Sequence, residues 1–547
     1  MITTSMTMAQ AFRQVAGRHL RQEALVCGEM RATYGQVADR ITALACGLDG
    51  VGIGKGDKVA VALPPGPEFV CLFFALAELG AVIVPINPQL RHGQLSHLLQ
   101  HSEPVALVTS GWLETAEDRQ MIEDLRSEVP GLRHIILADG ETGSGLNLAG
   151  LMSAAVASFR PPEVAPDDLL AILYTSGTTG TPKGTMHSHR SLMTPVLASL
   201  KLREMWIKKP SLQTMKRLAK VLPRYGERLL RAAGRPQTFL STTGFHTITG
   251  LEVMLQALLM GDRLVIMPRF HPLEALQLIE KERVTVLIAV PMALSILLRV
   301  EDLDRYDLSS LLICGTGSAP CPPDLARQIQ KRFGCAIHIG FGTTELAGGI
   351  AATSLEDSDD LQAETVGQPM PGMEVKIVDE ERREVPRGQV GELACRGDSV
   401  MMGYWRAPDK TSEVVDEEGW YYTGDLATMD EQGYVRIVGR KKDMIIRGGQ
   451  NIYPAEIENY LMSHPKIREA AVVGVPASIL GERTWAFIIL EEGAEMTAQE
   501  VLDYCRQGMD AYKVPDRVRF VSDWPRAASG KPQKFRLREM ALQEQAR

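Results

Sequence analysis

Short apolar runs separated by helix-length segments dominate the chain before residue 320. Most of these runs are apolar throughout instead of alternating with polar residues, which predicts strands buried on both faces of parallel sheets. Strands that alternate with helices predict an α/β architecture. The runs lie at 58–63, 81–84, 105–108, 134–138, 169–173, 263–267, 285–289 and 310–314.

One apolar stretch allows two interpretations. Residues 69–86 carry a single charged side chain, and a run of this length can be a membrane span. However, Gly80 and Pro85 interrupt it. A helix at 68–79 followed by a strand at 81–85 is therefore favoured, so the sequence predicts a buried α/β unit here.

The pattern changes after about residue 370. Shorter strands with polar flanks follow at 374–378, 390–396 and 434–438. Such strands are typical of a smaller subdomain, which we expect to be a distorted barrel attached to the large α/β layers.

The C-terminal part predicts a compact α+β unit. Helices are expected at 454–463 and 497–508, and strands at 469–475 and 484–490. Four charged residues at 440–443 separate two apolar strands and mark a boundary. We therefore predict a large N-terminal domain over 1–440 and a small C-terminal domain over 441–547.

A basic segment at 201–236 is the most unusual part of the chain. It contains eleven Lys and Arg residues against Glu204 and Glu227. Apolar residues recur there every three or four positions, as on one face of a helix, and Pro223 is expected to kink or split that helix. The favoured interpretation is a solvated helix that covers the N-terminal domain. The alternatives are binding to an anionic membrane surface or to an acyl carrier protein.

Size and charge restrict the function. A chain of 547 residues is too long for one ordinary core, so at least two domains are expected. The net charge of −8 argues against nucleic acid as a partner. Eight scattered cysteines with no C-x-x-C pair indicate reduced thiols. We predict a cytoplasmic protein, or one peripheral at a membrane, and leave open whether it is a homodimer.

A run rich in hydroxyl groups and glycines follows the apolar strand at 169–173. It reads Tyr-Thr-Ser-Gly-Thr-Thr-Gly-Thr-Pro-Lys-Gly and spans 174–184. Glycines let backbone N–H groups approach an anion, hydroxyls donate further hydrogen bonds, and Lys183 supplies positive charge. It is not a Walker loop, because Pro182 and Gly184 stand where that pattern needs Gly and Ser or Thr. The run predicts an oligophosphate-binding loop, with a polar surface loop as the alternative.

Four further segments extend this observation. They are Gly340-Phe-Gly-Thr-Thr-Glu345, Tyr422-Thr-Gly-Asp-Leu426, Gly439-Arg-Lys-Lys-Asp443 and Arg526-Ala-Ala-Ser-Gly-Lys531. In this order the five segments resemble the acyl-adenylate-forming (AMP-binding) superfamily, in its acyl- and aryl-CoA synthetase branch. The basic segment is longer than the connection that the family usually has at that place.

For ATP, the resemblance implies two groups of residues. The phosphate-binding residues are Thr175, Ser176, Gly177, Thr178, Thr179, Gly180 and Lys183. The adenine-binding segment consists of Gly340, Phe341, Gly342 and Thr343. Phe341 stands where the family more often has tyrosine. Its ring can still stack on adenine, but it provides no phenolic hydrogen bond.

The resemblance also implies which residues surround the α-phosphate. Glu345 and Thr175 are the expected Mg²⁺ ligands, because Mg²⁺ prefers carboxylate and phosphate oxygens and keeps several waters. Thr344 is expected to donate a hydrogen bond to the α-phosphate. Lys531 is the implied catalytic lysine, which bridges the carboxylate substrate and the α-phosphate in the first step.

Five more positions are assigned by the same resemblance. Asp425 is expected to accept both ribose hydroxyls, and Arg440 is expected to contact the ribose or a phosphate. Lys442 is expected to be the hinge about which a mobile C-terminal domain swivels. Gly448 and Gly449 are expected to line a tunnel for the pantetheine arm of CoA.

The pocket for the acid is implied by three segments. Phe245 and His246 stand where the family has an aromatic pair, with His246 as a catalytic candidate. Residues 315–319 and 346–349 resemble the other walls, and their small side chains indicate room for a sizeable apolar acid. Gly244 departs from the proline that is common at that position.

These assignments predict an ATP-dependent, AMP-forming acyl-CoA synthetase that uses ATP, Mg²⁺ and CoA. The expected substrate is a hydrophobic carboxylic acid, a fatty acid first and an aromatic or alicyclic acid second. Two rival functions stay open: an adenylating enzyme that loads a carrier protein or an amine, and a non-catalytic adenylate-binding sensor.

Overall fold

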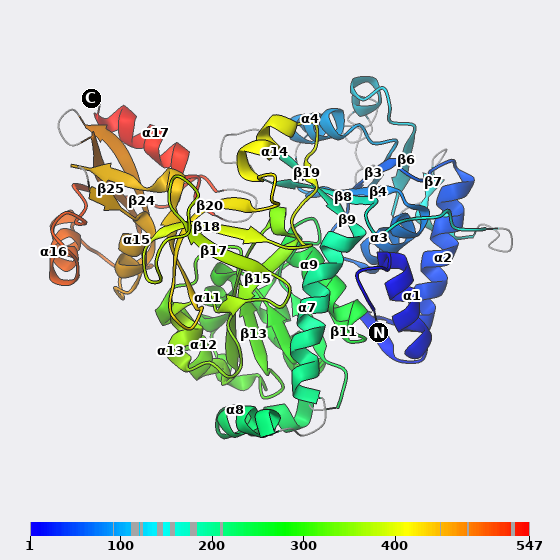
Figure 1. Ribbon diagram of the computed structural model, residues 1–547, viewed down its shortest axis with the longest axis horizontal. Coiled ribbons are helices and arrows are strands. Elements are labelled where there is room, and N and C mark those ends of the chain that lie inside the picture. The colour runs from blue at the N-terminus through cyan, green and yellow to red at the C-terminus, as the bar shows by residue number, and fades with distance from the viewer. Residues whose placement is uncertain are drawn as a thin grey trace.

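Two large sheets carry most of the chain up to Tyr404, with helices packed around them (Figure 1). The computed structural model describes residues 2–90, 92–110, 120, 124–138, 146–153, 159–175, 183–207, 212–232, 234–448, 450–477, 481–526 and 531–545. A smaller antiparallel sheet and a C-terminal α+β unit follow, so the predicted α/β layers and the smaller C-terminal part are present.

The first sheet has nine strands within the described residues. Their order is β16 (Gln368–Pro369), β15 (Gly348–Ala352), β14 (Ala336–Thr343), β13 (Ile313–Thr316), β12 (Val286–Ile288), β10 (Thr238–Ser241), β11 (Arg263–Ile266), β1 (Glu23–Cys27) and β2 (Met30–Thr33). The pairs from β14 to β1 are parallel, as the apolar runs predicted. The strand predicted at 310–314 begins later in the structure, at Ile313.

The second sheet has eight strands among the described residues. Their order is β19 (Gly403–Tyr404), β9 (Lys183–Ser188), β8 (Leu169–Thr175), β4 (Val82–Pro85), β3 (Lys58–Ala62), β5 (Ala106–Thr109), β6 (His134–Leu137) and β7 (Leu146–Asn147). The pairs from β8 to β7 are parallel, whereas β9 pairs antiparallel with β8 and with β19. Residues far apart in the sequence, near 183 and near 404, are thereby brought side by side.

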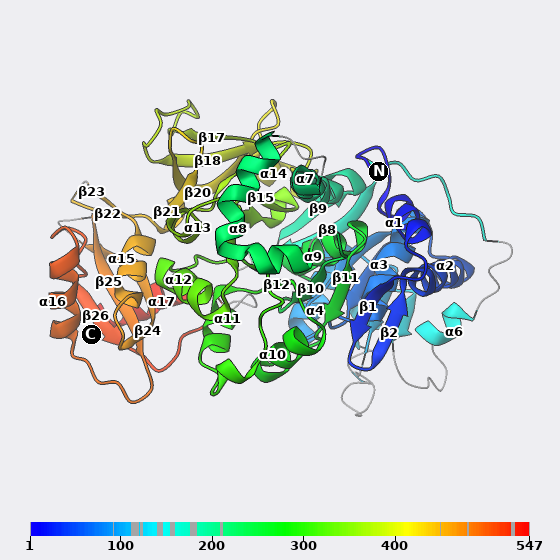
Figure 2. The same ribbon diagram turned by 90° about the horizontal axis from the view of Figure 1, so that it is seen from below.

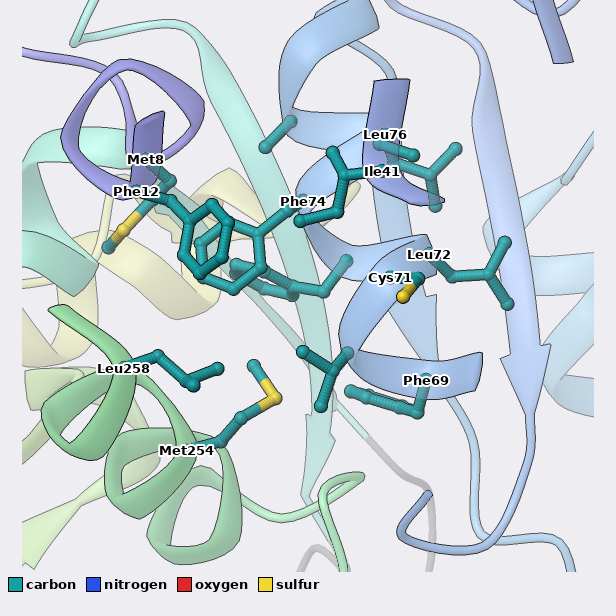
Figure 3. Close-up of a cluster of buried hydrophobic side chains, with 14 of the residues drawn as sticks. Met8, Phe12, Ile41, Phe69, Cys71, Leu72, Phe74, Leu76, Met254 and Leu258 are labelled. Atoms are coloured by element: carbon teal, nitrogen blue, oxygen red, sulfur yellow. The ribbon is translucent and has the colours of Figure 1, made fainter. Parts of the chain in front are cut away.

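Three helices from distant parts of the chain share one core. They are α1 (Met8–Arg18), α3 (Pro67–Leu79) and α9 (Ile248–Leu259), and Figure 3 shows Phe12, Phe74 and Met254 among the side chains that meet between them. The single charge in the apolar stretch, Glu78, is buried and accepts a hydrogen bond from Arg13 at 2.8 Å. The apolar stretch forms the predicted helix and strand, α3 and β4, and not a membrane span. None of the helices in the described part of the chain is both long and apolar enough to cross a bilayer.

The other helices described before the C-terminal part cover the sheets. They are α2 (Tyr34–Gly50), α4 (His92–Ser102), α6 (Leu148–Met152), α7 (His189–Ile207), α8 (Leu212–Ala232), α10 (Pro272–Lys281), α11 (Pro291–Leu298), α12 (Pro323–Phe333), α13 (Asp359–Glu364) and α14 (Pro408–Val414). The α2 helix begins with a capping box in which Thr33 and Gln36 satisfy each other's backbone N–H groups.

The predicted distorted barrel corresponds to an antiparallel sheet of four described strands. They are β17 (Glu374–Val378), β18 (Gly391–Arg396), β20 (Tyr421–Met429) and β21 (Val435–Arg440). The sheet lies between the two large sheets and the C-terminal part (Figure 1).

The C-terminal part is the predicted α+β unit. Its elements are β22 (Ile445–Arg447), β23 (Gln450–Ile452), α15 (Pro454–Met462), β24 (Ile467–Ala477), β25 (Gly481–Leu490), α16 (Ala498–Gly508), β26 (Arg517–Phe520) and α17 (Lys534–Gln545). One bidentate contact to the N-terminal domain is made by Arg299, which donates to both oxygens of Glu491 at 3.0 and 2.5 Å.

The basic segment contains the end of α7 and all of α8, which extends along the N-terminal domain (Figure 2). Pro223 lies inside this helix, so of the two expected outcomes, a kink or a split, the split does not occur. Val221 and Tyr225 pack against the neighbouring core, and several arginines bind groups of the same chain, among them Arg228, which donates to the Leu311 carbonyl. These contacts favour a helix that covers the N-terminal domain, because they use up much of its positive charge.

Candidate active site

The expected phosphate loop closes the hairpin between β8 and β9. Thr175 pairs with Lys183 across this antiparallel hairpin. The loop residues Ser176, Gly177, Thr178, Thr179 and Gly180 lie outside the described residues, as does the side chain of Thr175. The two strands nonetheless place Lys183 at the mouth of the loop.

Tyr404 lies between two of the expected site residues. Its hydroxyl donates a hydrogen bond to Glu345 Oε1 at 2.9 Å, and Lys183 Nζ is 4.7 Å from the centroid of its ring. Burial and the nearby carboxylate raise the pKa of Tyr404, which keeps the phenol protonated as a donor. The sequence analysis missed this residue, because it is 59 positions from Glu345 in the chain.

Backbone contacts fix the segment around Glu345. Glu345 belongs to a short 3₁₀ helix, Thr344–Leu346, at the end of β14. Its carbonyl accepts from the N–H of Met401 at 2.8 Å, and the Thr344 carbonyl lies 2.7 Å from His187 Nε2. The backbone contacts fix the position of Glu345, and the Tyr404 hydroxyl orients its carboxylate.

Replacing Tyr404 with phenylalanine should weaken metal use without removing the carboxylate. We expect about tenfold more Mg²⁺ to be needed for half-maximal adenylate formation, since partners that orient a metal ligand typically matter by that amount. The measurement is a Mg²⁺ titration of AMP formation. Tyr422→Phe, which loses only a hydrogen bond to Asp416, is the matched control. An unchanged Mg²⁺ requirement in Tyr404→Phe would refute this role for the phenol.

The expected adenine segment lies on β14, where it faces β15. Gly342 is required by this packing, because a Cβ there would come within 1.9 Å of the Gly348 carbonyl oxygen. Phe341 packs partly against the core of the small antiparallel sheet and stays half-buried. Thr343 Oγ1 is buried and has no hydrogen-bond partner among the described residues, so it can still bind a ligand. Gly340 lies at the start of the same pairing, opposite Ala352.

Asp425 and Arg440 are neighbours on adjacent strands. They pair in register on β20 and β21, and Arg440 Nε donates to Asp425 Oδ1 at 2.8 Å. Burial raises the pKa of Asp425, and the Arg440 guanidinium opposes that effect. The second oxygen, Oδ2, is buried with no partner within the described part of the chain. A buried acceptor of this kind is available to a ribose hydroxyl.

Lys531 reaches the same place from the C-terminal part. Burial, and then the positive charge of Arg440, lower the pKa of Lys531 to about 8, while Asp425 opposes the shift. Arg526, earlier in the same motif, donates to both oxygens of Glu469 at 2.9 and 2.8 Å. The structure therefore brings together Lys531, Asp425 and Arg440, which the sequence analysis had assigned to one site.

The expected hinge and CoA residues lie next to this site. Lys442 is in a 3₁₀ helix, Lys441–Asp443, directly after β21, and burial lowers its pKa. Gly448 has a φ of +59° at the two-residue turn between β22 and β23, a conformation that favours glycine. Gly449 lies outside the described residues.

Two of the three segments expected to enclose the acid contact α9, the helix that begins just after Phe245 and His246. Thr249 in the first turn of α9 lies 2.5 Å from Ser318 in the loop after β13, measured between their hydroxyl oxygens. Glu252, one turn further along α9, accepts a hydrogen bond from the N–H of Gly349 on β15 at 3.2 Å. Sequence reasoning did not single out Glu252, since an isolated glutamate in an apolar helix carries no motif.

His246 lies just before α9. Burial lowers its pKa to about 4, so the imidazole is neutral at ordinary pH. Its Nδ1 has no hydrogen-bond partner among the described residues. The ring lies against the backbone of Gly244, where a Cβ would come within 2.5 Å of it. This contact explains why glycine replaces the more common proline before the aromatic pair.

The described residues contain no group of three or more His, Cys, Asp or Glu side chains placed to hold a metal ion. That finding does not conflict with Mg²⁺, which is commonly bound through one or two carboxylates together with substrate phosphates and water. Glu345, oriented by the Tyr404 hydroxyl, fits such a site, and Lys183 lies over the ring of the same tyrosine.

Two family models match the chain. One, described as AMP-binding enzyme, matches residues 12–405, and the other, described as AMP-binding enzyme C-terminal domain, matches residues 456–531. The first match spans more than half of the 547 residues. The chain belongs to the AMP-binding enzyme family. The resemblance inferred from the five segments is confirmed.

Relatives of this AMP-binding enzyme carry acyl-CoA ligase names. YngI of Bacillus subtilis (strain 168), named as an acyl-CoA synthetase, is 34% identical over 561 residues, which cover 98% of this chain and 97% of that protein. The human mitochondrial medium-chain acyl-CoA ligase ACSF2 is 33% identical over 565 residues, covering 98% and 87%. The AMP-binding enzyme described here is a ligase of the acyl-CoA synthetase kind.

Solved structures of other AMP-binding enzymes share the whole fold. The anthranilate CoA ligase AuaEII, in complex with anthranoyl-AMP, has a TM-score of 0.85 at 25% identity and covers 100% of this chain and 99% of its own. The amide bond synthetase McbA from Marinactinospora thermotolerans has a TM-score of 0.82 at 28% identity, with 98% and 99% covered. The predicted fold class, with a large N-terminal and a smaller C-terminal domain, is confirmed.

Proposed function

We propose that this chain is an ATP-dependent, AMP-forming acyl-CoA synthetase that activates a hydrophobic carboxylic acid. The observation that carries the proposal is the position of Lys531, which comes from the C-terminal part and lies close to Asp425 and Arg440 of the N-terminal part. Buried Lys531 supplies positive charge, and Asp425 has one oxygen without a hydrogen-bond partner among the described residues. Both features suit the joining of an acid to a nucleotide.

In the first step, a carboxylate oxygen of the acid attacks the α-phosphorus of ATP, and the bond to the β-phosphate breaks to release pyrophosphate. Two anions meet, so the charge of Lys531 stabilises the transition state between them. Asp425 accepts from the ribose hydroxyls and Arg440 holds Asp425 in place. Mg²⁺, when bound at Glu345, supplies further positive charge to the phosphates.

In the second step, the sulfur of CoA attacks the acyl carbonyl carbon. The bond from that carbon to the phosphate oxygen of AMP breaks, AMP leaves, and the thiol proton passes to solvent. The pantetheine arm approaches along Gly448 and Gly449. We assign the two domains to 1–440 and 441–547, with a swivel at Lys442 that exchanges Lys531 for the CoA-binding surface.

The substrate that we propose is a fatty acid, with aromatic or alicyclic acids second. The medium-chain acids named for ACSF2 support the first choice, and anthranilate, named for AuaEII, supports the second. Transfer of the acyl group to an amine in place of CoA is the main rival, because McbA is named as an amide bond synthetase. Transfer to a carrier protein, or a non-catalytic role as an adenylate-binding sensor, ranks below it.

A product screen separates these functions. The purified protein is incubated with ATP, Mg²⁺, CoA and a panel of fatty, aromatic and alicyclic acids, and products are identified by mass spectrometry. Acyl-CoA with an equal amount of AMP is expected. Acyl adenylate without thioester would favour the amine or carrier-protein acceptor, and no product from any acid would favour the sensor.

For α8 we propose a second role, as a contact to an anionic membrane surface, with a carrier protein as the alternative partner. The helix exposes Met215 and Leu230, at 61% and 71%, and also the lysines Lys216 and Lys220. Apolar side chains flanked by lysines favour the headgroup region of anionic lipids. The enzyme would then be cytoplasmic and peripheral at the membrane. The notion of a homodimer stays a prediction.

The lipid contact can be tested without disturbing the packed face of α8. Met215→Ser combined with Leu230→Ser should abolish co-sedimentation with anionic vesicles, while turnover of soluble acids stays unchanged. Vesicles of neutral lipid serve as the control, and Leu20→Ser, at an exposed position on another element, is the control variant. Equal sedimentation of the double variant and the parent would overturn the proposal, and loss of binding to an acyl carrier protein instead would support the carrier protein as partner.

A further inference from the structure

Glu252 places a carboxyl group against the segment 346–349, one of the expected walls of the acid pocket. The side chain projects from α9 toward the start of β15, and a Cβ on Gly348 would come within 2.4 Å of its Oε2. It therefore lies directly over Gly348 and Gly349, only a few residues beyond Glu345. On the same helix, Thr249 contacts Ser318 of another expected wall.

Glu252 lies in a recess rather than on the outer surface. The residue keeps some accessible surface. At the same time, protein surrounds the carboxyl closely enough that desolvation raises the pKa of Glu252 to about 7, an effect that the hydrogen bond from the Gly349 N–H opposes. A side chain that is both accessible and enclosed lines an internal hollow. His246, six positions earlier, is half-buried and also keeps a buried nitrogen without a partner among the described residues.

The carboxyl group has unused hydrogen-bonding capacity. One oxygen accepts from the Gly349 N–H at 3.2 Å and the other from the amide of Gln256 at 3.0 Å. A carboxylate offers about four acceptor positions, so about two are open. Within the described part of the chain no Lys, Arg or His forms an ion pair with Glu252, and a poorly compensated acid in an apolar helix is costly. Packing alone gives no reason for a glutamate at position 252.

We propose that Glu252 is a specificity-determining residue that accepts a hydrogen bond from a hydroxyl or amino group on the acyl chain of the substrate. The inference rests on the proposed function, since it assumes that these walls enclose the acid. It refines the substrate class from a purely hydrophobic acid to a largely apolar acid that carries one hydrogen-bond donor.

Two neighbouring residues fix the orientation of the Glu252 carboxyl group. Gln256 and Gly349 hold one oxygen each, so the carboxyl plane is fixed before the substrate arrives. A fixed acceptor loses little entropy on binding, and a substrate without the donor leaves it unpaired in the recess. Sites of this type discriminate against the analogue that lacks the polar group far more strongly than apolar pockets discriminate by size.

The test compares matched acids within each protein. AMP formation is measured for a medium-chain acid and for its forms hydroxylated or aminated at successive positions, and the ratio of kcat/KM values is taken for each pair. In the parent enzyme above pH 7, where Glu252 is mainly ionised, one hydroxylated or aminated form should exceed the plain acid by about 10- to 100-fold, the usual effect of a hydrogen bond to a charged group. The ratio does not depend on the fraction of correctly folded protein.

Two variants then locate the effect. Glu252→Leu should bring the ratio to about one or reverse it, while the plain acid is still activated. Glu252→Gln, which keeps the shape and one acceptor oxygen, should show an intermediate ratio even if the leucine variant folds poorly. Gln256→Leu, on the next turn of α9, is the matched control and should keep the preference in reduced form.

The outcomes separate the two proposals. Equal activation of plain, hydroxylated and aminated acids by the parent enzyme would overturn the role of Glu252 and leave the synthetase function intact. So would a preference that survives in both Glu252 variants. If no acid yields AMP, it is the synthetase function that fails.

Discussion

Replacing Lys531 with alanine is expected to slow adenylate formation by about 10²- to 10³-fold, the usual effect of removing one group that stabilises developing negative charge. Thioester formation from added acyl adenylate should be nearly unchanged, because the ammonium group is needed only while two anions approach each other. The measurement is pyrophosphate release in the first step, compared with CoA consumption when the adenylate is supplied. Equal losses in both steps would contradict the assignment.

The control for this variant is Lys534→Ala. Lys534 lies three positions further along, is partly exposed and pairs with Glu458 at 2.7 Å. It has the same charge as Lys531 but lies in an ion pair within the C-terminal part. A loss of adenylation in Lys534→Ala as large as that in Lys531→Ala would point to general damage of this part, and not to catalysis by Lys531.

The pH dependence of the first step follows from the same residue. Burial lowers the pKa of Lys531 to about 8, so its charge is present below that pH and is lost as the pH rises through it. The kcat/KM for the acid reports groups of the free enzyme. It should therefore fall above about pH 8 in the parent enzyme, and the fall should be missing from the small residual activity of Lys531→Ala. A decline of the same shape in both proteins would assign it to another group.

Replacing Asp425 with alanine is expected to lower kcat/KM for ATP by about 10²-fold, as for the loss of hydrogen bonds to a charged group. The buried oxygen without a partner among the described residues is the one that we assign to the ribose. Asp425→Asn, which keeps an acceptor but no charge, should lose less. Initial rates of pyrophosphate release at varied ATP give these values.

Substrate analogues make this test specific for the ribose. The parent enzyme should use 3′-deoxy-ATP much less well than ATP, whereas Asp425→Ala should use the two almost equally. If the variant still discriminates against the deoxy nucleotide as strongly as the parent, Asp425 does not hold that hydroxyl. Thermal melting of the variant checks that loss of the contact with Arg440 has not unfolded the small sheet.

Local patterns were sufficient for much of the fold. Buried parallel strands are apolar on both faces, so runs such as 58–63 and 105–108 predicted β3 and β5 from composition alone. Gly80 ends α3 in the left-handed conformation, which is why the division of the apolar stretch at this residue was correct. Charge at 440–443 marked the end of β21 because solvated loops separate apolar strands.

Local patterns did not predict features that depend on which other segment packs against a helix. Nothing in the basic segment showed that Val221 and Tyr225 would face the core while Met215 and Leu222 would face solvent. The expectation at Pro223 was a kink or a split, and the helix is not split there, since tertiary packing of an amphipathic helix can outweigh the local cost of proline.

The sequence by itself determined the family, the order of the strands along the chain and the identity of the charged residues, because each is written in a short stretch of chain. Only the tertiary structure decided which of them meet. Tyr404 reaches Glu345 because β19 pairs with β9, and Lys531 reaches Asp425 because the C-terminal part lies against the small sheet. Glu252 is a candidate specificity residue only because α9 lies against β15. Distances between residues far apart in the chain are set by packing, and no local pattern encodes them.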